Sequence, residues 1–356
     1  MSSASGITKR MALGVDAAGA VIDSGDLFPV GSASKLATGL LILRLVDLGT
    51  FELDAPLSEY LPAAAASSDA NITIRRLLTH TSGLGLEAPH ELSSPPGELR
   101  YNEALKWPGK LAETCLAEKP VQPAGHSVRY SNIGYGLLGL AAERQCNAPF
   151  KNLIRSHVLD PAGVEGAWGE VPSQRAIVIR DTPSPYIGTD IEPINSAHWL
   201  SIGSPWAGLL TNVDGLLKLV RAYLDESPII STELARLARS NQTVGLSGGF
   251  PAGEAFLGHA LSKEVFWKDC AWGLTVEIQG GKRPHWAPSS LPRSFGQIGS
   301  TGCLAWCDPD SGLAWAILGA RSADTGWLTL YGPKIAQAAV AAFAPSMSPE
   351  RNFSPN

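Results

Sequence analysis

Apolar residues recur at helical spacing in several parts of the chain, and the first such segment is the longest. It begins directly after Ser-Ala-Ser-Lys at residues 32–35, where leucines and a valine follow, and it is expected to end at Gly49. The same spacing predicts further helices over residues 72–78, 102–118, 132–144 and 214–223 and a last one that starts at Pro333.

Strand patterns lie near both ends of the chain. Residues 11–30 fit a strand, a turn and a short strand that leads into the first helix. Residues 295–306 and 313–319 fit a hairpin around Asp-Pro-Asp-Ser-Gly at 308–312, which is rich in turn-forming residues. Residues 176–200 are irregular and rich in Pro and Ser.

This order of elements predicts an α+β protein with an antiparallel sheet flanked by helices. The sheet domain would comprise residues 1–49 and 205–356, and residues 50–204 would form an inserted, mainly helical domain. We expect the active site at their junction, because ligand sites favour such interfaces.

Composition narrows the class of protein. The chain has 356 residues, of which 44% are hydrophobic, so it can bury a large core as a soluble globular protein. Its net charge is −5 and it has no Lys/Arg-rich block, which argues against a nucleic-acid partner. No apolar stretch approaches the roughly 20 residues of a membrane helix, so no membrane partner is expected.

The five cysteines and seven histidines form no recognisable metal or disulfide pattern. Neither a C-x-x-C pair nor an H-E-x-x-H motif is present. Cys303 and Cys307 lie four residues apart on a predicted strand, where about 13 Å separates their backbones, too far for a disulfide. We therefore expect free thiols, no metal and no cofactor.

Ser32 and Lys35 set a hydroxyl and an amine one turn apart at the start of the first helix. A serine hydroxyl needs a base beside it before it can attack an acyl carbon. Lys35 can be that base if burial or a neighbouring cation keeps its amine partly neutral. Alone, the pair also fits a solvated helix start with a serine cap.

Two later segments favour the catalytic interpretation. Residues 123–135 read Pro-Ala-Gly-His-Ser-Val-Arg-Tyr-Ser-Asn-Ile-Gly-Tyr, in which a Gly/Pro loop brings Tyr130 and Asn132 just before a helical pattern. Residues 296–302 read Gly-Gln-Ile-Gly-Ser-Thr-Gly and precede alternating apolar residues.

In this order and separation the three motifs resemble those of the serine β-lactamase and penicillin-binding-protein superfamily: S-x-x-K, Y-x-N, and K-T-G or H-x-G on an edge strand. Leu-Leu-Thr-His-Thr-Ser-Gly-Leu at 77–84 and Pro-Trp-Ala-Gly-Leu-Leu-Thr at 205–211 resemble further family signatures. The resemblance runs from about Phe28 to the C-terminal helix and is closest to class C β-lactamases and family VIII carboxylesterases. It implies the β-lactamase/transpeptidase-like fold.

The resemblance implies a role for each residue of the first two motifs. Ser32 would be the nucleophile and Lys35 its partner. Tyr130 would hydrogen-bond both and share the proton with Lys35 as a coupled pair. Asn132 would orient Lys35 and the substrate carbonyl, or it would only cap the helix that follows.

The resemblance also implies an oxyanion hole made by the backbone N–H groups of Ser32 and Ser300. Gly299 and Gly302 would let substrate lie close to that strand. Gln297 departs from the pattern, because relatives place lysine or histidine there to help bind a carboxylate. Glutamine has no charge, so this position favours neutral acyl esters or amides.

Other candidates have simpler interpretations. Trp206 and Trp286 would form an apolar acyl pocket or belong to the core. Ser247 lies in a G-x-S-x-G match, but the required strand before it and helix after it are not predicted. His80 is expected to be a structural histidine that bonds loop backbone.

The beginning of the chain is a second departure. Members of the superfamily usually start with a helix and a full strand, whereas about 30 residues precede Ser32 here. The first helix and strand are expected to be absent or replaced, or else the start codon is assigned too late. Residues 1–10 are polar and do not resemble a signal peptide, so a cytoplasmic location is expected unless a leader has been lost.

The sequence therefore predicts a serine hydrolase that cleaves short or medium acyl esters through an acyl-enzyme on Ser32. Alternatives are a β-lactamase, a D-amino-acid peptidase or amidase, and an acyltransferase. A member of the family that binds a ligand or peptide without catalysis is a further alternative. The expected partner is a small ester, amide or lactam, and the oligomeric state is left open.

Overall fold

The computed structural model describes residues 8–86, 106–182, 186–250, 255–256, 259–260, 265–282 and 286–343. Its main sheet is antiparallel, with strands in the order β12-β11-β10-β9. These strands are β9 (Glu277–Ile278), β10 (Phe295–Gly299), β11 (Cys303–Cys307) and β12 (Ala314–Leu318).

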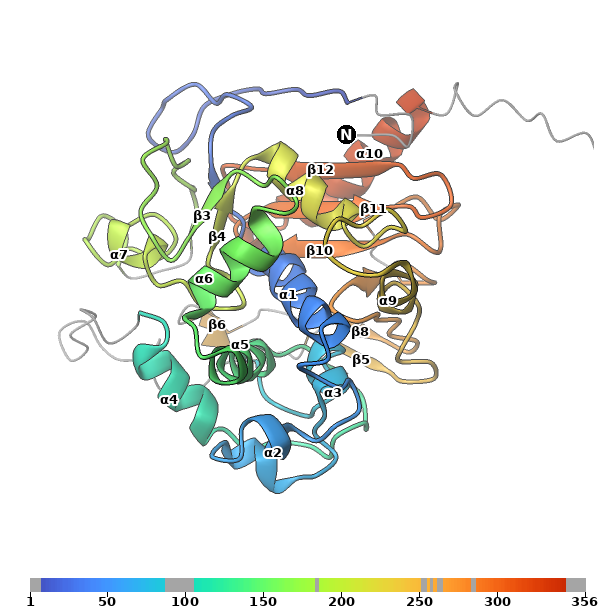
Figure 1. Cartoon of the computed structure of the whole chain (residues 1–356). Helices are drawn as coiled ribbons and strands as arrows, with labels where there is room; N and C mark the ends of the chain where they lie inside the picture. Colours follow the sequence, from blue (N-terminus) through green and yellow to red (C-terminus); the bar gives the residue numbers. More distant parts are fainter. Residues whose placement is uncertain are drawn as a thin grey trace, which may run out of the picture.

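Helix α1 (Lys35–Asp47) runs through the middle of the molecule, as Figure 1 shows. It follows a 3₁₀ turn, η1 (Gly31–Ser34), and ends at Leu48, after which Gly49 has a φ of 72°. Every residue of α1 up to Leu43 is buried. A helix that is apolar on nearly all sides suits a central position, which explains why its sequence is rich in leucine.

The two faces of the sheet meet different helices because side chains alternate along each strand. Phe295, Cys303 and Ala305 belong to the large core that includes α1 and α8 (Val213–Arg221). Leu304 and Trp306 belong to a second core with Leu328 of α10 (Trp327–Phe343). Figure 1 shows α10 behind the strands, away from α1.

The other helices lie mostly on the side of α1 away from the sheet, with α5 packed against α1 (Figure 1). They are α2 (Leu57–Tyr60), η2 (Ala65–Ser68), α3 (Ile74–Leu78), α4 (Gly109–Ala117), α5 (Asn132–Cys146), α6 (Phe150–Ile154), the π-helical turn η4 (Arg155–Leu159) and α7 (Ala197–Leu200). Two further elements come later in the chain, α9 (Thr232–Ala238) and the turn η5 (Ala323–Thr325).

There are also three small sheets, of which the first two join segments that are distant in sequence. The first has the order β1-β4-β3, the second β2-β5-β8, and the third pairs β6 with β7. Their strands are β1 (Phe28–Pro29), β2 (Val128–Arg129), β3 (Gly166–Trp168), β4 (Leu209–Thr211), β5 (Gly248–Phe250), β6 (Ala255–Phe256), β7 (His259–Ala260) and β8 (Val265–Trp267).

Several predicted helices are confirmed with small shifts at their ends. Those expected over 72–78, 132–144 and 214–223 correspond to α3, α5 and α8. The helix predicted over 102–118 begins only at Gly109, and residues 102–105 lie outside the described part.

Three predictions of local structure are only partly confirmed. In the segment 11–30 the short strand before the first helix is present as β1, but the earlier strand is reduced to isolated bridges, one between Val15 and Val21 and one between Leu27 and Ala176. The hairpin around residues 308–312 is confirmed, since β11 pairs with β12, but the segment 295–306 is two strands, β10 and β11, because Gly302 has a φ of 94° and reverses the chain. The last helix starts at Trp327, ahead of Pro333, because burial of Leu328 against the sheet extends the helix toward its N-terminus.

The predicted domain division stays a prediction. The sheet β1-β4-β3 and the sheet β2-β5-β8 each combine strands from both predicted domains, and α5 shares one core with α1.

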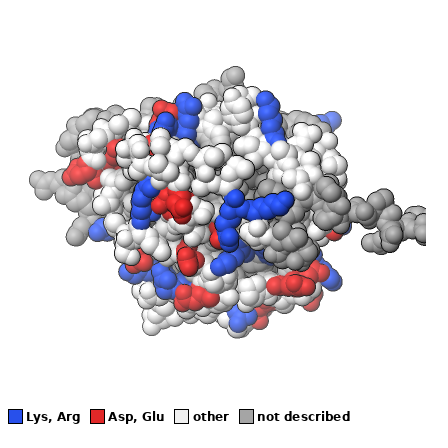
Figure 2. Space-filling model, turned by 90° about the horizontal axis from the view of Figure 1, so that it is seen from above, with Lys and Arg blue, Asp and Glu red and all other residues white. Residues whose placement is uncertain are grey.

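The surface carries mixed charge. On the face drawn in Figure 2, Lys and Arg side chains are interspersed with Asp and Glu. Among the described residues, no helix has both the length and the apolar character needed to cross a lipid bilayer.

Candidate active site

Ser32 and Lys35 meet at the junction of η1 and α1. The Lys35 Nζ donates a hydrogen bond of 3.2 Å to the Ser32 Oγ. The Lys35 side chain is completely buried and Ser32 is 9% exposed. The predicted contact between the hydroxyl and the amine is therefore present.

Two other segments contact the same amine. The Oδ1 of Asn132 accepts a hydrogen bond of 2.6 Å from the Lys35 Nζ, and the carbonyl oxygen of Trp206 accepts one of 3.4 Å. The carbonyl of Trp206 was not predicted, since a backbone group leaves no mark in the sequence.

Asn132 and its neighbour divide the two roles that the sequence left open. The Oγ of Ser131 accepts the Gly134 N–H and caps α5, whereas Asn132 is the first residue of the helix and turns its amide to Lys35. Serine is a preferred cap residue, so the sequence did hold a signal for the role of Ser131.

Helix α1 also fixes the position of the Trp206 carbonyl. The Thr38 Oγ1 donates to the carbonyl of Pro205, and the Ser34 Oγ accepts the N–H of Leu209. The side chains of Thr38 and Ser34 thus hold the two ends of the segment 205–209. The acceptors around Lys35 are set by α1 itself and by the helix that packs against it.

Tyr130 lies just beyond β2 and is 4% exposed. The Lys35 Nζ is 4.7 Å from the centroid of its ring. Its backbone N–H donates to the carbonyl of Gly249, and its ring lies 4.6 Å from that of Phe250. The structure therefore brings the Tyr130 ring beside Lys35, and the predicted hydrogen bonds of its hydroxyl to Ser32 and Lys35 stay a prediction.

His80 bonds loop backbone, which confirms the structural role expected for it. Its Nδ1 accepts the N–H of Ser131 at 3.1 Å, and its carbonyl accepts that of Arg129 at 2.7 Å. Burial, and secondarily the charge of Lys35, hold the pKa of His80 well below its usual value. Its imidazole is therefore neutral.

The third motif lies against the turn that carries Ser32. A methyl group added to Gly31 would lie 3.5 Å from the nitrogen of Ser300, and one added to Gly299 would lie 3.4 Å from the nitrogen of Ser32. That added methyl would also be 2.1 Å from the carbonyl oxygen of Val30, so position 299 requires glycine. The two predicted oxyanion donors thus sit on adjacent backbone segments.

A separate turn holds Ser300 in place. Its carbonyl oxygen accepts the N–H of Ala323 at 2.8 Å and the hydroxyl of Ser322 at 3.3 Å. The carbonyl of Gly299 accepts the N–H of Gly302 at 3.0 Å. These bonds fix the peptide that carries the Ser300 N–H.

Gln297 is 1% exposed, so its side chain is enclosed. Its Nε2 donates to the carbonyl of Thr275 at 2.8 Å, and its Oε1 accepts the N–H of Ile298 at 3.3 Å. The amide is therefore used for internal bonds, and a role in substrate binding stays a prediction.

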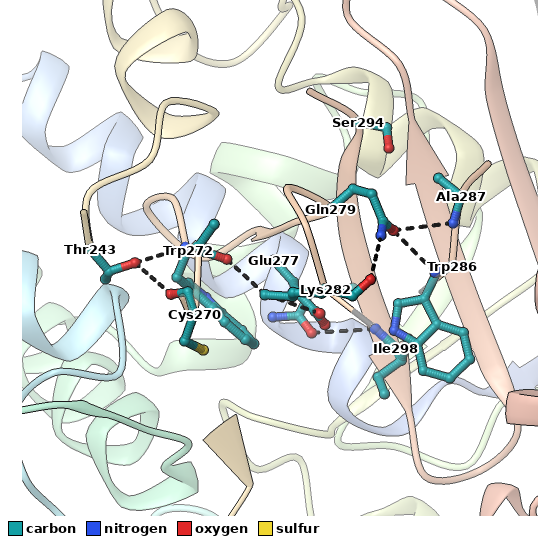
Figure 3. Close-up of polar contacts among 12 residues, drawn as sticks. Thr243, Cys270, Trp272, Glu277, Gln279, Lys282, Trp286, Ala287, Ser294 and Ile298 are labelled. Carbon is teal, nitrogen blue, oxygen red and sulfur yellow. Dashed lines mark hydrogen bonds and ion pairs between the residues drawn. The ribbon is translucent and has the colours of Figure 1, made fainter. Parts of the chain in front are cut away.

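The tryptophans predicted for an acyl pocket are placed differently. Trp286 is 7% exposed and packs in the second core, with Leu304 and Trp306, on the far side of the sheet. In Figure 3 a strand lies between Trp286 and Trp272. Trp206 packs against Gly136 of α5 and Trp107. The core interpretation is therefore the correct one for Trp286.

Ser247 is excluded as a nucleophile elbow. It precedes the strand β5, and its carbonyl accepts the N–H of Val128. The geometry of that motif needs a strand before the serine and a helix after it.

A buried ion pair supports the wall behind Tyr130. The Lys282 Nζ lies 3.1 Å from the Glu277 Oε1 and 4.8 Å from the ring centroid of Trp272 (Figure 3). The Trp272 ring is 6.0 Å from that of Tyr130. Within the described ranges, no three His, Cys, Asp or Glu side chains gather in a way that could hold a metal ion.

A family model described as Beta-lactamase matches residues 12–328. A "Beta-lactamase" from Providencia stuartii is 23% identical over 261 residues, which are 72% of this chain and 60% of the relative. "Esterase EstB" from Burkholderia gladioli is 28% identical over 250 residues, which are 63% of this chain and 64% of the relative. The chain thus spans less than two thirds of the length of either relative.

The fold is also that of solved structures. The penicillin binding protein from Bacillus halodurans aligns with a TM-score of 0.67 at 18% identity, over 96% of this chain and 94% of that one. The β-lactamase/transpeptidase-like fold predicted from the motifs is confirmed. Because the family model matches most of the chain and the fold agrees with it, the chain belongs to the Beta-lactamase family.

Proposed function

We propose that this protein is a serine hydrolase that cleaves small acyl esters through a covalent acyl-enzyme on Ser32. The observation that carries the proposal is the hydrogen bond of 3.2 Å between the Nζ of the completely buried Lys35 and the Ser32 Oγ. Three donated bonds are those of an ammonium, so the proposed step begins with loss of one proton from Nζ. Removal from water favours this loss, and the neutral amine then accepts the serine proton through its lone pair.

In the proposed reaction, the Ser32 Oγ attacks the carbonyl carbon of the ester while its proton passes to the coupled pair of Lys35 and Tyr130. The N–H groups of Ser32 and Ser300 stabilise the negative oxygen of the tetrahedral intermediate. The proton then passes to the leaving alcohol. Water repeats the sequence on the acyl-enzyme, releasing the acid and restoring Ser32.

The preference for esters rests on Gln297. Position 297 supplies no cation for a substrate carboxylate, and its amide is already bonded to the carbonyl of Thr275. The relatives include both a β-lactamase and an esterase, so family membership is compatible with either substrate class.

The test is active-site labelling combined with a substrate panel. A fluorophosphonate should add its mass to the peptide that contains Ser32, and Ser32→Ala should abolish both labelling and hydrolysis of p-nitrophenyl esters. Ser247→Ala is the matched control and should change neither.

Two outcomes would contradict the proposal. Labelling that survives in Ser32→Ala would reject the nucleophile. A higher kcat/KM for nitrocefin than for every ester in the panel would show that the protein is a β-lactamase rather than an esterase.

A further inference from the structure

His80 occupies an unusual backbone conformation beside the proposed catalytic groups. It lies two residues after the end of α3, is completely buried, and has a φ of 56°. Few residues other than glycine adopt such a φ, although histidine does so more often than most. This conformation allows the backbone and the ring of His80 to contact the same short segment.

That segment is the one that carries Tyr130. The carbonyl of His80 accepts the N–H of Arg129 on one side of Tyr130, and its Nδ1 accepts the N–H of Ser131 on the other. Between these two bonds the imidazole lies 4.3 Å from the Tyr130 ring, tilted by 31°. His80 therefore contacts Tyr130 and both of its chain neighbours.

Simple space filling does not explain a histidine here. The His80 Nε2 is buried and has no hydrogen-bond partner among the described residues, which is unfavourable relative to an apolar side chain. The rings of Tyr135 and Trp272, 5.2 and 5.0 Å away, complete an aromatic enclosure. What an apolar residue could not supply is the acceptor at Nδ1.

We propose that His80 is a positioning residue that fixes Tyr130 for catalysis through the hydrogen bond from the Ser131 N–H to Nδ1. The inference rests on the proposed function and adds a residue to it. Since Nδ1 accepts a hydrogen bond, the proton of the neutral imidazole is on Nε2. His80 therefore transfers no proton, and its effect reaches the substrate only through Tyr130.

Two amide variants separate the acceptor from the remaining properties of the side chain. In His80→Asn the Oδ1 can take the place of Nδ1, whereas in His80→Gln the oxygen lies one bond further from the backbone and cannot. We expect the Asn variant to keep kcat within about threefold, and the Gln variant to lose about ten- to a hundredfold with little change in KM. Equal kcat in the two variants would overturn the proposal.

The Tyr130→Phe background shows whether the loss passes through Tyr130. If His80 acts by placing the tyrosine hydroxyl, His80→Gln should cost nothing further in that background, measured on a p-nitrophenyl ester or by the rate of Ser32 labelling. Backbone strain from glutamine at this φ would lower activity equally in both backgrounds. Independent, multiplicative losses would thus contradict the proposal.

A measurement on the unmodified protein keeps the proposal testable even if a variant fails to fold. Nitrogen NMR of His80 at neutral pH should show the neutral tautomer with its proton on Nε2. A proton on Nδ1 would overturn the inference. Absence of Ser32 labelling in the wild-type protein would instead reject the proposed function, so the two failures are distinguishable.

Discussion

The amine of Lys35 contacts a serine, an asparagine and a backbone carbonyl from three separate parts of the chain. All three are fixed by elements that pack against each other, so the amine has a defined position before substrate arrives. Preorganised groups of this kind avoid the cost of reorganisation during the reaction.

Gln297 is the residue at which substrate preference is most directly testable. Gln297→Lys should raise the ratio of kcat/KM for a carboxylate-bearing cephalosporin to that for a neutral ester by about tenfold, because a charge-assisted hydrogen bond contributes about 1.5–3 kcal/mol. The site is enclosed, so solvent screens the new charge weakly. Because the new charge is buried, the Gln297→Lys variant should also have a lower free energy of unfolding than the wild type.

Gln297→Met is the matched control, since it keeps the length of the side chain without a charge. It should leave the ratio unchanged while losing the bond to Thr275. If the ratio stays flat in a folded Gln297→Lys variant, another feature of the site sets the preference.

At the level of elements, the close packing of α1 is the feature on which the site depends. A methyl group added to Gly39 would lie 2.0 Å from the Thr275 Oγ1. The glycine therefore allows α1 to approach the residue whose carbonyl accepts the Gln297 amide.

Gly39→Ala should consequently destabilise the protein. Overpacking costs about 1–3 kcal/mol, and the higher helix propensity of alanine returns about 1 kcal/mol of it. Gly134→Ala in α5 is the control, because its nearest neighbour would be 3.5 Å away, at ordinary contact distance. Denaturant unfolding should place Gly39→Ala below both wild type and Gly134→Ala, and equal stabilities would contradict the packing argument.

The sequence predicted elements best where local pattern and tertiary packing agree. Helices α3, α5 and α8 have clear apolar spacing and were found. The start of α10 was missed because burial of Leu328 outweighs the usual effect of Pro333. The break between β10 and β11 was missed because alternation of apolar residues continues past Gly302.

For the molecule as a whole, the buried thiols predict an alkaline limit to stability. Burial raises the pKa of Cys270, Cys303 and Cys307 to about 12. In the unfolded chain a thiol ionises near pH 8.5, so the unfolded state gains stability above that pH while the folded state keeps its protons. The contribution of these thiols is complete below about pH 8.5 and is lost as pH rises toward 12.

We expect the free energy of unfolding to fall by up to about 4 kcal/mol per pH unit once all three thiols ionise only in the unfolded chain, at about 1.4 kcal/mol each. Denaturant titrations between pH 8 and pH 9.5 measure the onset before tyrosines ionise. Cys303→Ala should reduce the slope by about a third, whereas Cys146→Ala, at a half-buried position, should change it less. A slope that is identical in all three proteins would contradict this origin.

The candidate site as a whole could not be assembled from local pattern. Ser32 and Lys35 are neighbours on a turn, but nothing in spacing places Tyr130 or Ser300 beside them. The resemblance of three ordered motifs supplied that grouping. It could not supply the Trp206 carbonyl, which is a backbone atom, or the bracketing of Tyr130 by His80, which depends on a backbone conformation.

The distances in sequence between these partners have a consequence for biosynthesis. Two of the acceptors of the Lys35 amine lie 97 and 171 residues further along the chain, and the strand β10 follows later still. Ser32 and Lys35 therefore emerge from the ribosome long before their partners do. The site cannot assemble until most of the polypeptide has emerged. The proposed nucleophile is therefore expected to be inactive until most of the chain has been synthesised and folded.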